Sequence, residues 1–379
     1  MTITLLVMGC TAEKPAEVLP PEKVQINVSI SDGFSQVAPD TPLRVSASAG
    51  VLTSVQVVPV DKTDEKAHAT VRGTLDATQR TWTAGRTLSP ATAYELRATA
   101  VDSTGGKVTK SMDFITLSPT RTNRALLGPD DAQVVGVGMP ITLRFSHKVT
   151  NKAAVEKSMK VVTTPATEGA WGWVLDPVTH QERLDWRPST FWRPGTKVVV
   201  TAALSGVDTG EKRYLPRDIS TEFSVGAARV TRVNLDSHRM TVTEDGRTVR
   251  TIPISGGGPD TPTLLGTMIV LDKAADIRMN SETVGLGNAY DKNVKWAVHL
   301  TSSGTYAHAA PWNTSLMGIR NASHGCVGMN TEDARWFYER SRPGDVVISS
   351  GSRGRAVDVG NGFGHWNTSF DQWKKRSAL

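Results

Sequence analysis

Hydrophobic and polar residues alternate in short segments along most of the chain. Residues 24–30 and 43–47 show this pattern near the N-terminus, and Gly, Pro and Asp residues separate such segments from one another. Successive side chains of a strand point to opposite faces of a sheet, so period-two alternation predicts half-buried strands. Short strands at close spacing predict a β-sandwich. We expect one sandwich at residues 23–120 and a second at residues 121–227.

Aromatic residues accompany the alternating segments in both regions. Trp82 and Tyr94 are expected to fill the core of the first sandwich. The second region carries a cluster of tryptophans, namely Trp171, Trp173, Trp186 and Trp192. Stacking on sugar rings is an alternative role for this cluster, but we expect most of its members to pack in the core or between domains. The sequence shows no catalytic constellation in either region, which suggests a stalk.

The pattern changes in residues 228–351, where strands are expected at 241–243, 249–252, 268–271, 296–300 and 345–348. Asp245-Gly246 lies between the first two, and an Asp-Gly step is a strong hairpin signal. One helix is expected at residues 331–341, with Asn330 or Thr331 as its N-cap and acidic residues in its first turn. These elements predict a β-rich domain with one main helix. Residues 352–379 form a C-terminal extension.

The length and charge of the chain restrict its class. A chain of 379 residues exceeds one comfortable hydrophobic core, so two to four domains are expected. The net charge of +6 suits an anionic partner surface such as a bacterial wall. Nucleic acid is the other interpretation of a basic chain. The Lys and Arg residues are scattered and no nucleic-acid-binding motif occurs, so we expect no nucleic-acid partner.

The first residues resemble the end of a lipoprotein signal. An apolar run leads to Gly9-Cys10, which is similar to a lipobox in which Cys10 would become the lipidated N-terminus. The run is too short to span a bilayer, and it lacks the basic segment of a signal peptide. We therefore interpret residues 1–22 as a truncated signal and a flexible tether. Lipidation of Cys10 would anchor the protein to the outer face of the cytoplasmic membrane.

The second of the two cysteines carries the candidate chemistry. Cys326 ends the sequence SHGC at residues 323–326, and His308 precedes it across a loop rich in Gly, Asn, Ser and Pro. A thiol attacks acyl groups as the thiolate, so it needs a base within hydrogen-bond reach. A buried structural cysteine is the alternative, and the spacing alone leaves the two readings evenly matched. This pattern does not favour a zinc site, because zinc takes three or four ligands at short spacings and the segment has one Cys, two His and no CxxC.

This segment resembles the active-site signature of the L,D-transpeptidases with a YkuD-type catalytic domain, which have a histidine, a loop and then Ser/Thr-His-Gly-Cys. HAAPW at residues 308–312 is similar to the family's His-Ser-Ala-Pro-Trp, and MNS at 279–281 resembles its Met-Asp-Ser. PT at 262–263 and GT at 266–267 resemble the Pro-Thr-x-x-Gly motif near the start of the family's catalytic domain. Tyr290 lies where actinobacterial members carry an active-site tyrosine.

The resemblance implies a mostly β fold with two immunoglobulin-like β-sandwich domains, a YkuD-type catalytic domain, and an extension that packs on the catalytic domain through its tryptophans. It implies no cofactor. Cys326 would be the nucleophile and His308 the base, with the carbonyl of Ala309 orienting His308 and the backbone at Gly325 and the Tyr290 hydroxyl meeting the oxyanion. The implied substrate-binding residues are Tyr290, Met279, Trp312, Ser323, His324 and Asn330.

The implied reaction joins two peptidoglycan stem peptides. A stem tetrapeptide acylates the cysteine and releases D-alanine, and the side-chain amine of residue 3 of a second stem then forms a 3→3 cross-link. Carbapenem-type β-lactams are the implied covalent inhibitors. Hydrolysis of the same thioester would make an L,D-carboxypeptidase, and a non-catalytic wall-binding protein is a third possibility. One departure is Gly328, which stands where many relatives have Asn or Arg.

Overall fold

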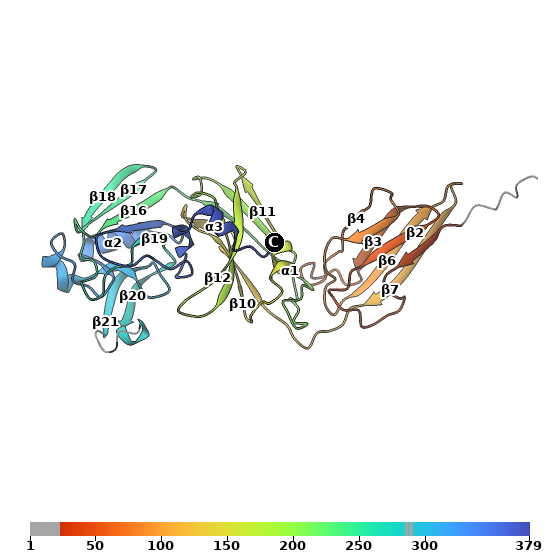
Figure 1. Ribbon diagram of the computed structural model, residues 1–379, viewed down its shortest axis with the longest axis horizontal. Coiled ribbons are helices and arrows are strands. Elements are labelled where there is room, and N and C mark those ends of the chain that lie inside the picture. The colour runs from red at the N-terminus through yellow and green to blue at the C-terminus, as the bar shows by residue number, and fades with distance from the viewer. Residues whose placement is uncertain (1–22, 285–286, 288–290) are drawn as a thin grey trace, which may run out of the picture.

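The computed structural model describes residues 23–284, 287 and 291–379, so Cys10 and Tyr290 lie outside the described residues. Three β-rich units follow one another in a row (Figure 1). The mostly β fold class expected from the sequence is confirmed. Within the described residues, no helix is long and apolar enough to cross a membrane.

The first unit packs two sheets against each other. One sheet has the strand order β1-β2-β5-β4 and the other β3-β6-β7. Trp82 and Tyr94 are buried between the sheets, which confirms the core role expected for both. The strands are β1 Gln25–Val28, β2 Arg44–Ser48, β3 Val51–Pro59, β4 Gly73–Leu75, β5 Thr81–Ala84, β6 Ala93–Val101 and β7 Lys107–Ile115.

The second unit is also a sandwich, with sheets ordered β12-β13-β10-β8 and β11-β14-β15-β9. Trp173, Trp186 and Trp192 are buried in its cores, so packing accounts for three of the four tryptophans of the cluster. Its elements are β8 Ala125–Gly128, β9 Val134–Val135, β10 Ile141–Phe145, α1 Lys152–Lys157, β11 Met159–Thr164, β12 Gly169–Leu175, β13 Glu182–Pro188, β14 Lys197–Ala202 and β15 Ile219–Val225.

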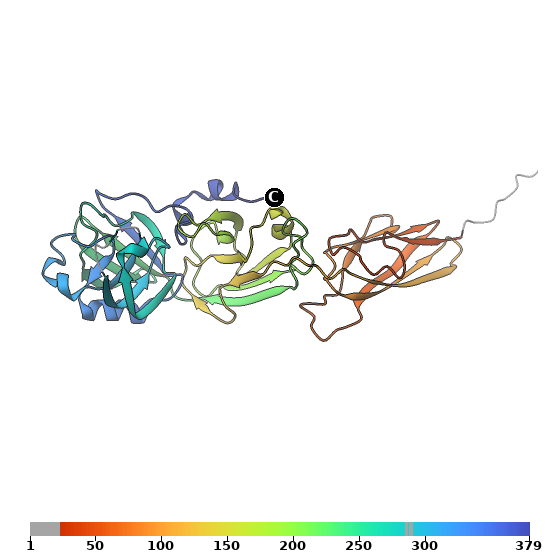
Figure 2. The ribbon, with the colours of Figure 1, turned by 90° about the horizontal axis from the view of Figure 1, so that it is seen from below.

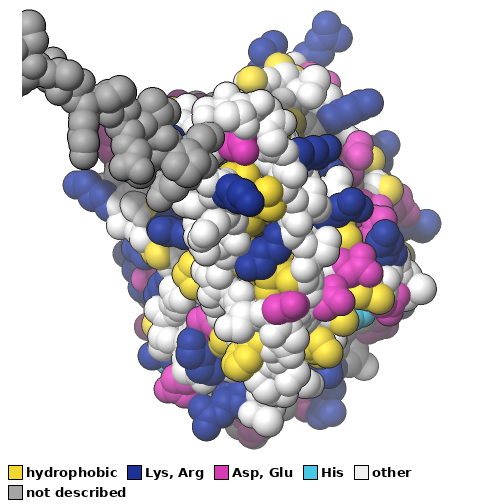
Figure 3. All heavy atoms as spheres, turned by 90° about the vertical axis from the view of Figure 1, so that its right-hand side faces the viewer, with side chains coloured by type: hydrophobic (Ala, Val, Ile, Leu, Met, Phe, Trp, Pro, Cys, Tyr) yellow, Lys and Arg dark blue, Asp and Glu magenta, His cyan; other side chains and the backbone are white. Residues whose placement is uncertain are grey.

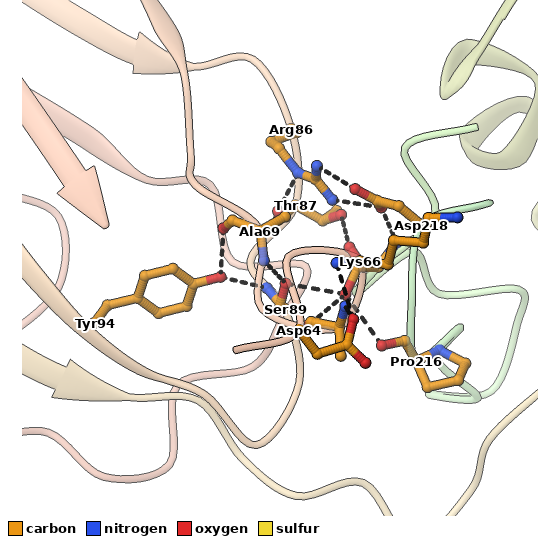
Figure 4. A network of polar contacts seen from close by, with 11 residues as sticks. Asp64, Lys66, Ala69, Arg86, Thr87, Ser89, Tyr94, Pro216 and Asp218 are labelled. Atoms are coloured by element: carbon orange, nitrogen blue, oxygen red, sulfur yellow. Dashed lines mark hydrogen bonds and ion pairs between the residues drawn. The ribbon is translucent and has the colours of Figure 1, made fainter. Parts of the chain in front are cut away.

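A polar network joins the two sandwiches (Figure 4). Both terminal nitrogens of the Arg86 guanidinium donate to the Asp218 carboxylate, at 2.7 and 2.8 Å. The hydroxyl groups of Ser89 and Ser205 lie 3.0 Å apart, and both residues are completely buried. Because this bidentate ion pair and buried hydroxyl contact link the first unit to the second, they restrict rotation between the sandwiches.

The free end of the first sandwich carries charges of both signs. Lys and Arg side chains are interspersed with Asp and Glu over this face (Figure 3). The face shown therefore has no large patch of a single sign.

The third unit has a five-stranded sheet ordered β18-β17-β16-β24-β19 and a four-stranded sheet ordered β20-β21-β22-β23. A shared core lies between them and also buries one face of α2. The elements are β16 Arg229–Asn234, β17 Arg239–Glu244, β18 Arg247–Pro253, β19 Gly266–Ile269, β20 Asp272–Asn280, η1 Ser281–Val284, β21 Asp291–His299, β22 Tyr306–Ala309, η2 Pro311–Leu316, β23 Val327–Met329, α2 Thr331–Arg340 and β24 Val346–Ser350.

Two local predictions for this unit are confirmed. Asp245 and Gly246 both have positive φ, at 48° and 80°, as a tight hairpin between β17 and β18 requires. Asn330 is the N-cap of α2, and its side chain accepts a hydrogen bond from the amide of Asp333. The cap fixes where the helix begins, immediately after β23.

The C-terminal extension returns from the third unit to the second sandwich, where the chain ends (Figures 1 and 2). It contains η3 Gly364–Asn367 and α3 Phe370–Lys374. The tryptophans of the extension were expected to pack on the catalytic domain, but their indole hydrogen bonds go to the second sandwich. The indole N–H groups of Trp366 and Trp373 donate to the carbonyls of Gly138 and Ala170, both in the second sandwich. Trp373 is buried there and Trp366 is half-buried, and Asn367 also bonds to Thr267 of the third unit, so the extension links the third unit to the second sandwich.

Candidate active site

One cavity of about 240 Å³ in the third unit is lined by His308 and by three residues of the SHGC segment, Ser323, His324 and Cys326. Two short parallel strands bring them together, because β22 pairs with β23 and His308 lies opposite Gly328. Cys326 comes directly before β23, so its side chain enters the same cavity as the imidazole of His308. The fold thus places in one cavity a nucleophile and a base that are separated in sequence by a loop.

His308 is held in one orientation and one tautomer. Its Nδ1 lies 2.7 Å from the carbonyl oxygen of Ala309. A carbonyl oxygen can only accept, so Nδ1 carries the proton and Nε2 of the neutral ring carries the lone pair. Burial lowers the pKa of His308 below its usual value, and the Ala309 carbonyl partly offsets this. The result is a neutral imidazole suited to accept a proton.

Cys326 is a free thiol in the wall of that cavity. Its Sγ lies 3.7 Å from the carbonyl oxygen of Gly304, to which the thiol can donate a weak hydrogen bond. Burial raises the pKa of Cys326 to about 11, although the backbone N–H of Tyr306 favours the thiolate. The resting site therefore holds a neutral thiol and a neutral imidazole.

The loop that carries the thiol is fixed by its own hydrogen bonds. The Ser323 hydroxyl donates to the Cys326 carbonyl at 2.6 Å and accepts from the Gly325 amide at 3.2 Å. Gly325 has φ of +114°, a backbone conformation that residues with a Cβ rarely adopt. Ser323 thus has a structural role in the turn, in addition to its place in the cavity wall.

A second loop, residues 256–258, forms hydrogen bonds with the turn that carries the thiol. The amide of Gly258 donates to the Ser323 carbonyl at 2.8 Å, and the amide of Ser323 donates to the Gly256 carbonyl at 2.9 Å. The side chain of Asn321 accepts from the Gly256 amide at 2.9 Å and donates to the Leu235 carbonyl at 2.8 Å. This support was not predicted, because the sequence gives no sign that residues 256–258 contact the SHGC segment.

The hairpin of β20 and β21 forms another wall. Met279 and Lys292 face each other across the two strands, and both line the cavity. Trp312, at the start of η2, is 45% exposed, and its ring centroid lies 6.1 Å from that of His308. Its partial exposure suits the mouth of the cavity. Sequence reasoning missed Lys292, which belongs to no motif.

The remaining predicted site residues differ in placement. His324 is exposed and lines the cavity. Asn330 does not line the cavity, and its side-chain oxygen and nitrogen both bond to Asp333 as the cap of α2. The side chain of Asn330 therefore serves as the helix cap and lies outside the cavity wall. Gly328 lines the cavity, and a Cβ there would lie 3.1 Å from the Cβ of Ala310, so this position is crowded.

A larger cavity, of about 540 Å³, lies between the second sandwich and the third unit. It contains Asp272 and His299, which lie 3.1 Å apart, but no cysteine lines it. Among the residues that the structure describes, no group of three or more His, Cys, Asp or Glu side chains could hold a metal ion. The smaller cavity is the one that joins a nucleophile to a base.

Comparisons with known proteins agree with this arrangement. The family model for the L,D-transpeptidase catalytic domain matches residues 228–348, and that for a bacterial Ig domain matches residues 34–208. L,D-transpeptidase 2 of Mycobacterium tuberculosis (strain CDC 1551 / Oshkosh) is 33% identical over 367 residues, covering 96% of this chain and 86% of the relative.

Two further matches extend the picture. L,D-transpeptidase 5 of Mycobacterium tuberculosis (strain ATCC 25618 / H37Rv) is 29% identical, covering 97% of this chain and 80% of the relative. A solved structure of an LD transpeptidase in complex with imipenem has a TM-score of 0.52 and 31% identity, and it covers 61% of this chain and 100% of the other. With a thiol and an oriented imidazole in one cavity, and with these relatives over nearly its full length, the chain belongs to the L,D-transpeptidase family.

Proposed function

We propose that this protein is a peptidoglycan L,D-transpeptidase in which Cys326 is the acyl-transfer nucleophile and His308 the general base. The observation that carries the proposal is the shared cavity, in which Nδ1 of His308 is fixed on the Ala309 carbonyl and the thiol of Cys326 lies nearby. Family membership supports a transferase. The cysteine thioester is our assignment from this geometry.

The first half-reaction acylates the enzyme. Nε2 of His308 accepts the thiol proton as Sγ attacks the carbonyl between residues 3 and 4 of a donor stem tetrapeptide. The tetrahedral intermediate collapses, its C–N bond breaks, and the proton on His308 passes to the departing amine of D-alanine. The product is a thioester on Cys326.

The second half-reaction transfers the acyl group. The side-chain amine of residue 3 of an acceptor stem attacks the thioester, His308 accepts a proton from that amine, and Cys326 leaves and is reprotonated. The oxyanion of both steps would be met by the backbone N–H of Cys326, with the Tyr290 hydroxyl as a further donor, because the Gly325 N–H already donates to the Ser323 hydroxyl. One such donor is typically worth about 3 kcal/mol of transition-state stabilisation.

The place of action follows from the substrate. We propose that the protein acts outside the cytoplasm, with residues 23–120 and 121–227 as a stalk that holds the catalytic unit, residues 228–351, in the cell wall. The polar network between the sandwiches and the docked C-terminal extension support a stiff arm. Lipidation of Cys10 remains a proposal, tested by comparing the lipid mass and membrane retention of a Cys10→Ser form.

β-Lactams offer a second probe of the same thiol. The solved relative in complex with imipenem suggests that carbapenems acylate Cys326 here as well. We expect imipenem to add its mass to the wild-type protein and to leave a Cys326→Ala variant unmodified.

The decisive experiment incubates the protein lacking Cys10 with a disaccharide-tetrapeptide and analyses products and protein by mass spectrometry. A cross-linked dimer with loss of D-alanine is expected, and Cys326→Ala and His308→Ala should form none while keeping the fold. Tripeptide alone would show an L,D-carboxypeptidase. Neither product, with no acyl adduct on Cys326, would show a wall-binding protein.

A further inference from the structure

The cavity around Cys326 has one fully charged side chain in its wall. Among the described residues that line it, Lys292 is the one Lys or Arg, and there is no Asp or Glu. His308 in this lining is neutral, because burial lowers its pKa. The wall is therefore electrostatically positive on the side of the β20–β21 hairpin.

Contacts hold the Lys292 ammonium at this position. Its Nζ lies 4.5 Å from the centroid of the Trp312 ring, within the range of a cation–π interaction. Met279 lies opposite Lys292 on β20 and packs in the same wall. Trp312 in turn lies beside His308, so the ammonium is held on the side of the cavity where the base is.

The neighbouring carboxylate is already engaged. Asp291 accepts two hydrogen bonds from Arg278, at 2.8 and 2.6 Å. In the parts of the chain that the structure describes, no ion pair joins Lys292 to a carboxylate. The aromatic face orients the ammonium without neutralising it, so the ammonium can still bind an anion.

The donor peptide supplies such an anion close to the bond that breaks. In a stem tetrapeptide, the terminal carboxylate is separated from the scissile carbonyl by only one nitrogen and one carbon atom. A cavity of about 240 Å³ is smaller than the ~300–1,000 Å³ of drug-sized ligand sites, so it holds the scissile bond and its immediate neighbours. A carboxylate drawn into this space needs a partner for its charge.

We propose that Lys292 binds the free terminal carboxylate of the donor stem and so selects stems that end one residue after the scissile bond. The proposal rests on the transpeptidase function proposed above. In an amidated or longer stem, the carboxylate is absent or displaced by a residue, and the ion pair with Lys292 is lost. Lys292 is a specificity-determining residue, because its partner departs with the released D-amino acid.

The test measures D-alanine release by wild-type protein, Lys292→Met, Lys292→Arg and the matched control Lys295→Met. Lys295 is an exposed lysine on the same strand and does not line the cavity. The substrates are the tetrapeptide, its C-terminal amide, and the tetrapeptide amidated at the carboxylate of residue 3. Circular dichroism checks that each variant is folded.

With the free tetrapeptide, Lys292→Met should raise KM about tenfold and leave kcat nearly unchanged. The variant loses one charge-assisted hydrogen bond to the substrate, and this bond stabilises the bound substrate and the transition state equally. With the C-terminal amide, the wild type and Lys292→Met should have the same KM. Lys292→Arg should keep most of the wild-type KM, and Lys295→Met should match the wild type.

Three results would overturn the inference: an unchanged KM in Lys292→Met, an equal loss with acid and C-terminal amide, or a loss that disappears only when residue 3 is amidated. The last would assign Lys292 to the other carboxylate. If the wild type released no D-alanine, the proposed function would fail independently of this inference. Calorimetric binding of the tetrapeptide to Cys326→Ala, with and without Lys292→Met, still decides the role of Lys292, because equal affinities would refute it.

Discussion

A neutral thiol at Cys326 makes a quantitative prediction for its reactivity towards iodoacetamide. Burial raises the pKa of this thiol from 9.0 to about 11, so the thiolate fraction at neutral pH falls about a hundredfold below that of an ordinary cysteine. A more basic thiolate is also a stronger nucleophile. With a Brønsted coefficient of about 0.4–0.5, this recovers roughly six- to tenfold. We expect Cys326 to be alkylated about tenfold more slowly than an exposed thiol.

The assay uses a Cys10→Ser form, which leaves one thiol in the chain. Alkylation is followed by mass spectrometry as a function of pH, with the protein unfolded in urea as the reference. The rate for the folded protein should rise about tenfold per pH unit through neutrality, without a plateau, because the thiolate fraction rises in this way below the pKa.

Acylation by the tetrapeptide should depend on pH differently. The neutral imidazole of His308 is the active form of the base, and burial lowers its pKa below 6.5. As pH rises, kcat/KM should increase through this lowered pKa and then stay level across neutrality. A folded protein that is alkylated at neutral pH as fast as the unfolded chain, with a rate independent of pH, would refute the reasoning. That result would show a thiolate–imidazolium pair.

Three substitutions test other features of the structure. Asn330→Ala removes the cap that bonds to Asp333 and should cost about 1 kcal/mol in urea unfolding with no change in KM; a raised KM with unchanged stability would restore a substrate role. Gly328→Ala places a Cβ 3.1 Å from that of Ala310 and should lower stability by about 1 kcal/mol, whereas a gain in stability would contradict the crowding. Burial and nearby guanidinium groups hold the pKa of His365 well below 6.5. As pH falls, the histidine of the unfolded chain is therefore protonated first, and the folded protein loses stability. His365→Phe should reduce the drop in melting temperature between about pH 7.5 and about pH 5, and a drop equal to that of the wild type would count against this role.

Local sequence was sufficient to predict the elements whose signals are short-range. The Asp245-Gly246 turn and the cap at Asn330 each depend on a few neighbouring residues, and both formed as expected. The spacing of His308 and Cys326 left a catalytic pair and a structural cysteine evenly matched, and it was the family resemblance that favoured the pair. The parallel pairing of β22 with β23, which brings both residues to one cavity, has no local signal in the sequence.

Features that depend on distant partners were not predictable in this way. The extension carries no signal for which domain Trp366 and Trp373 contact, since their acceptors lie about 200 residues earlier at Gly138 and Ala170. Lys292 lies in a polar stretch at the start of β21, where alternation is weak. Its place in the cavity depends on its pairing with Met279 across the hairpin.

The contacts around Gly328 explain why this position of the cavity wall carries no polar side chain. Strand β23 presents no side chain to the cavity at this position, and Ala310 leaves little room for one. The polar group that the family resemblance leads us to expect at this position is not supplied by Asn330, which caps α2. The charged group in the cavity wall comes instead from the hairpin, through Lys292. Because the nucleophile and base lie at strands β22 and β23 while the ammonium lies on the hairpin, substitutions in the sheet should change kcat and those at Lys292 should change KM.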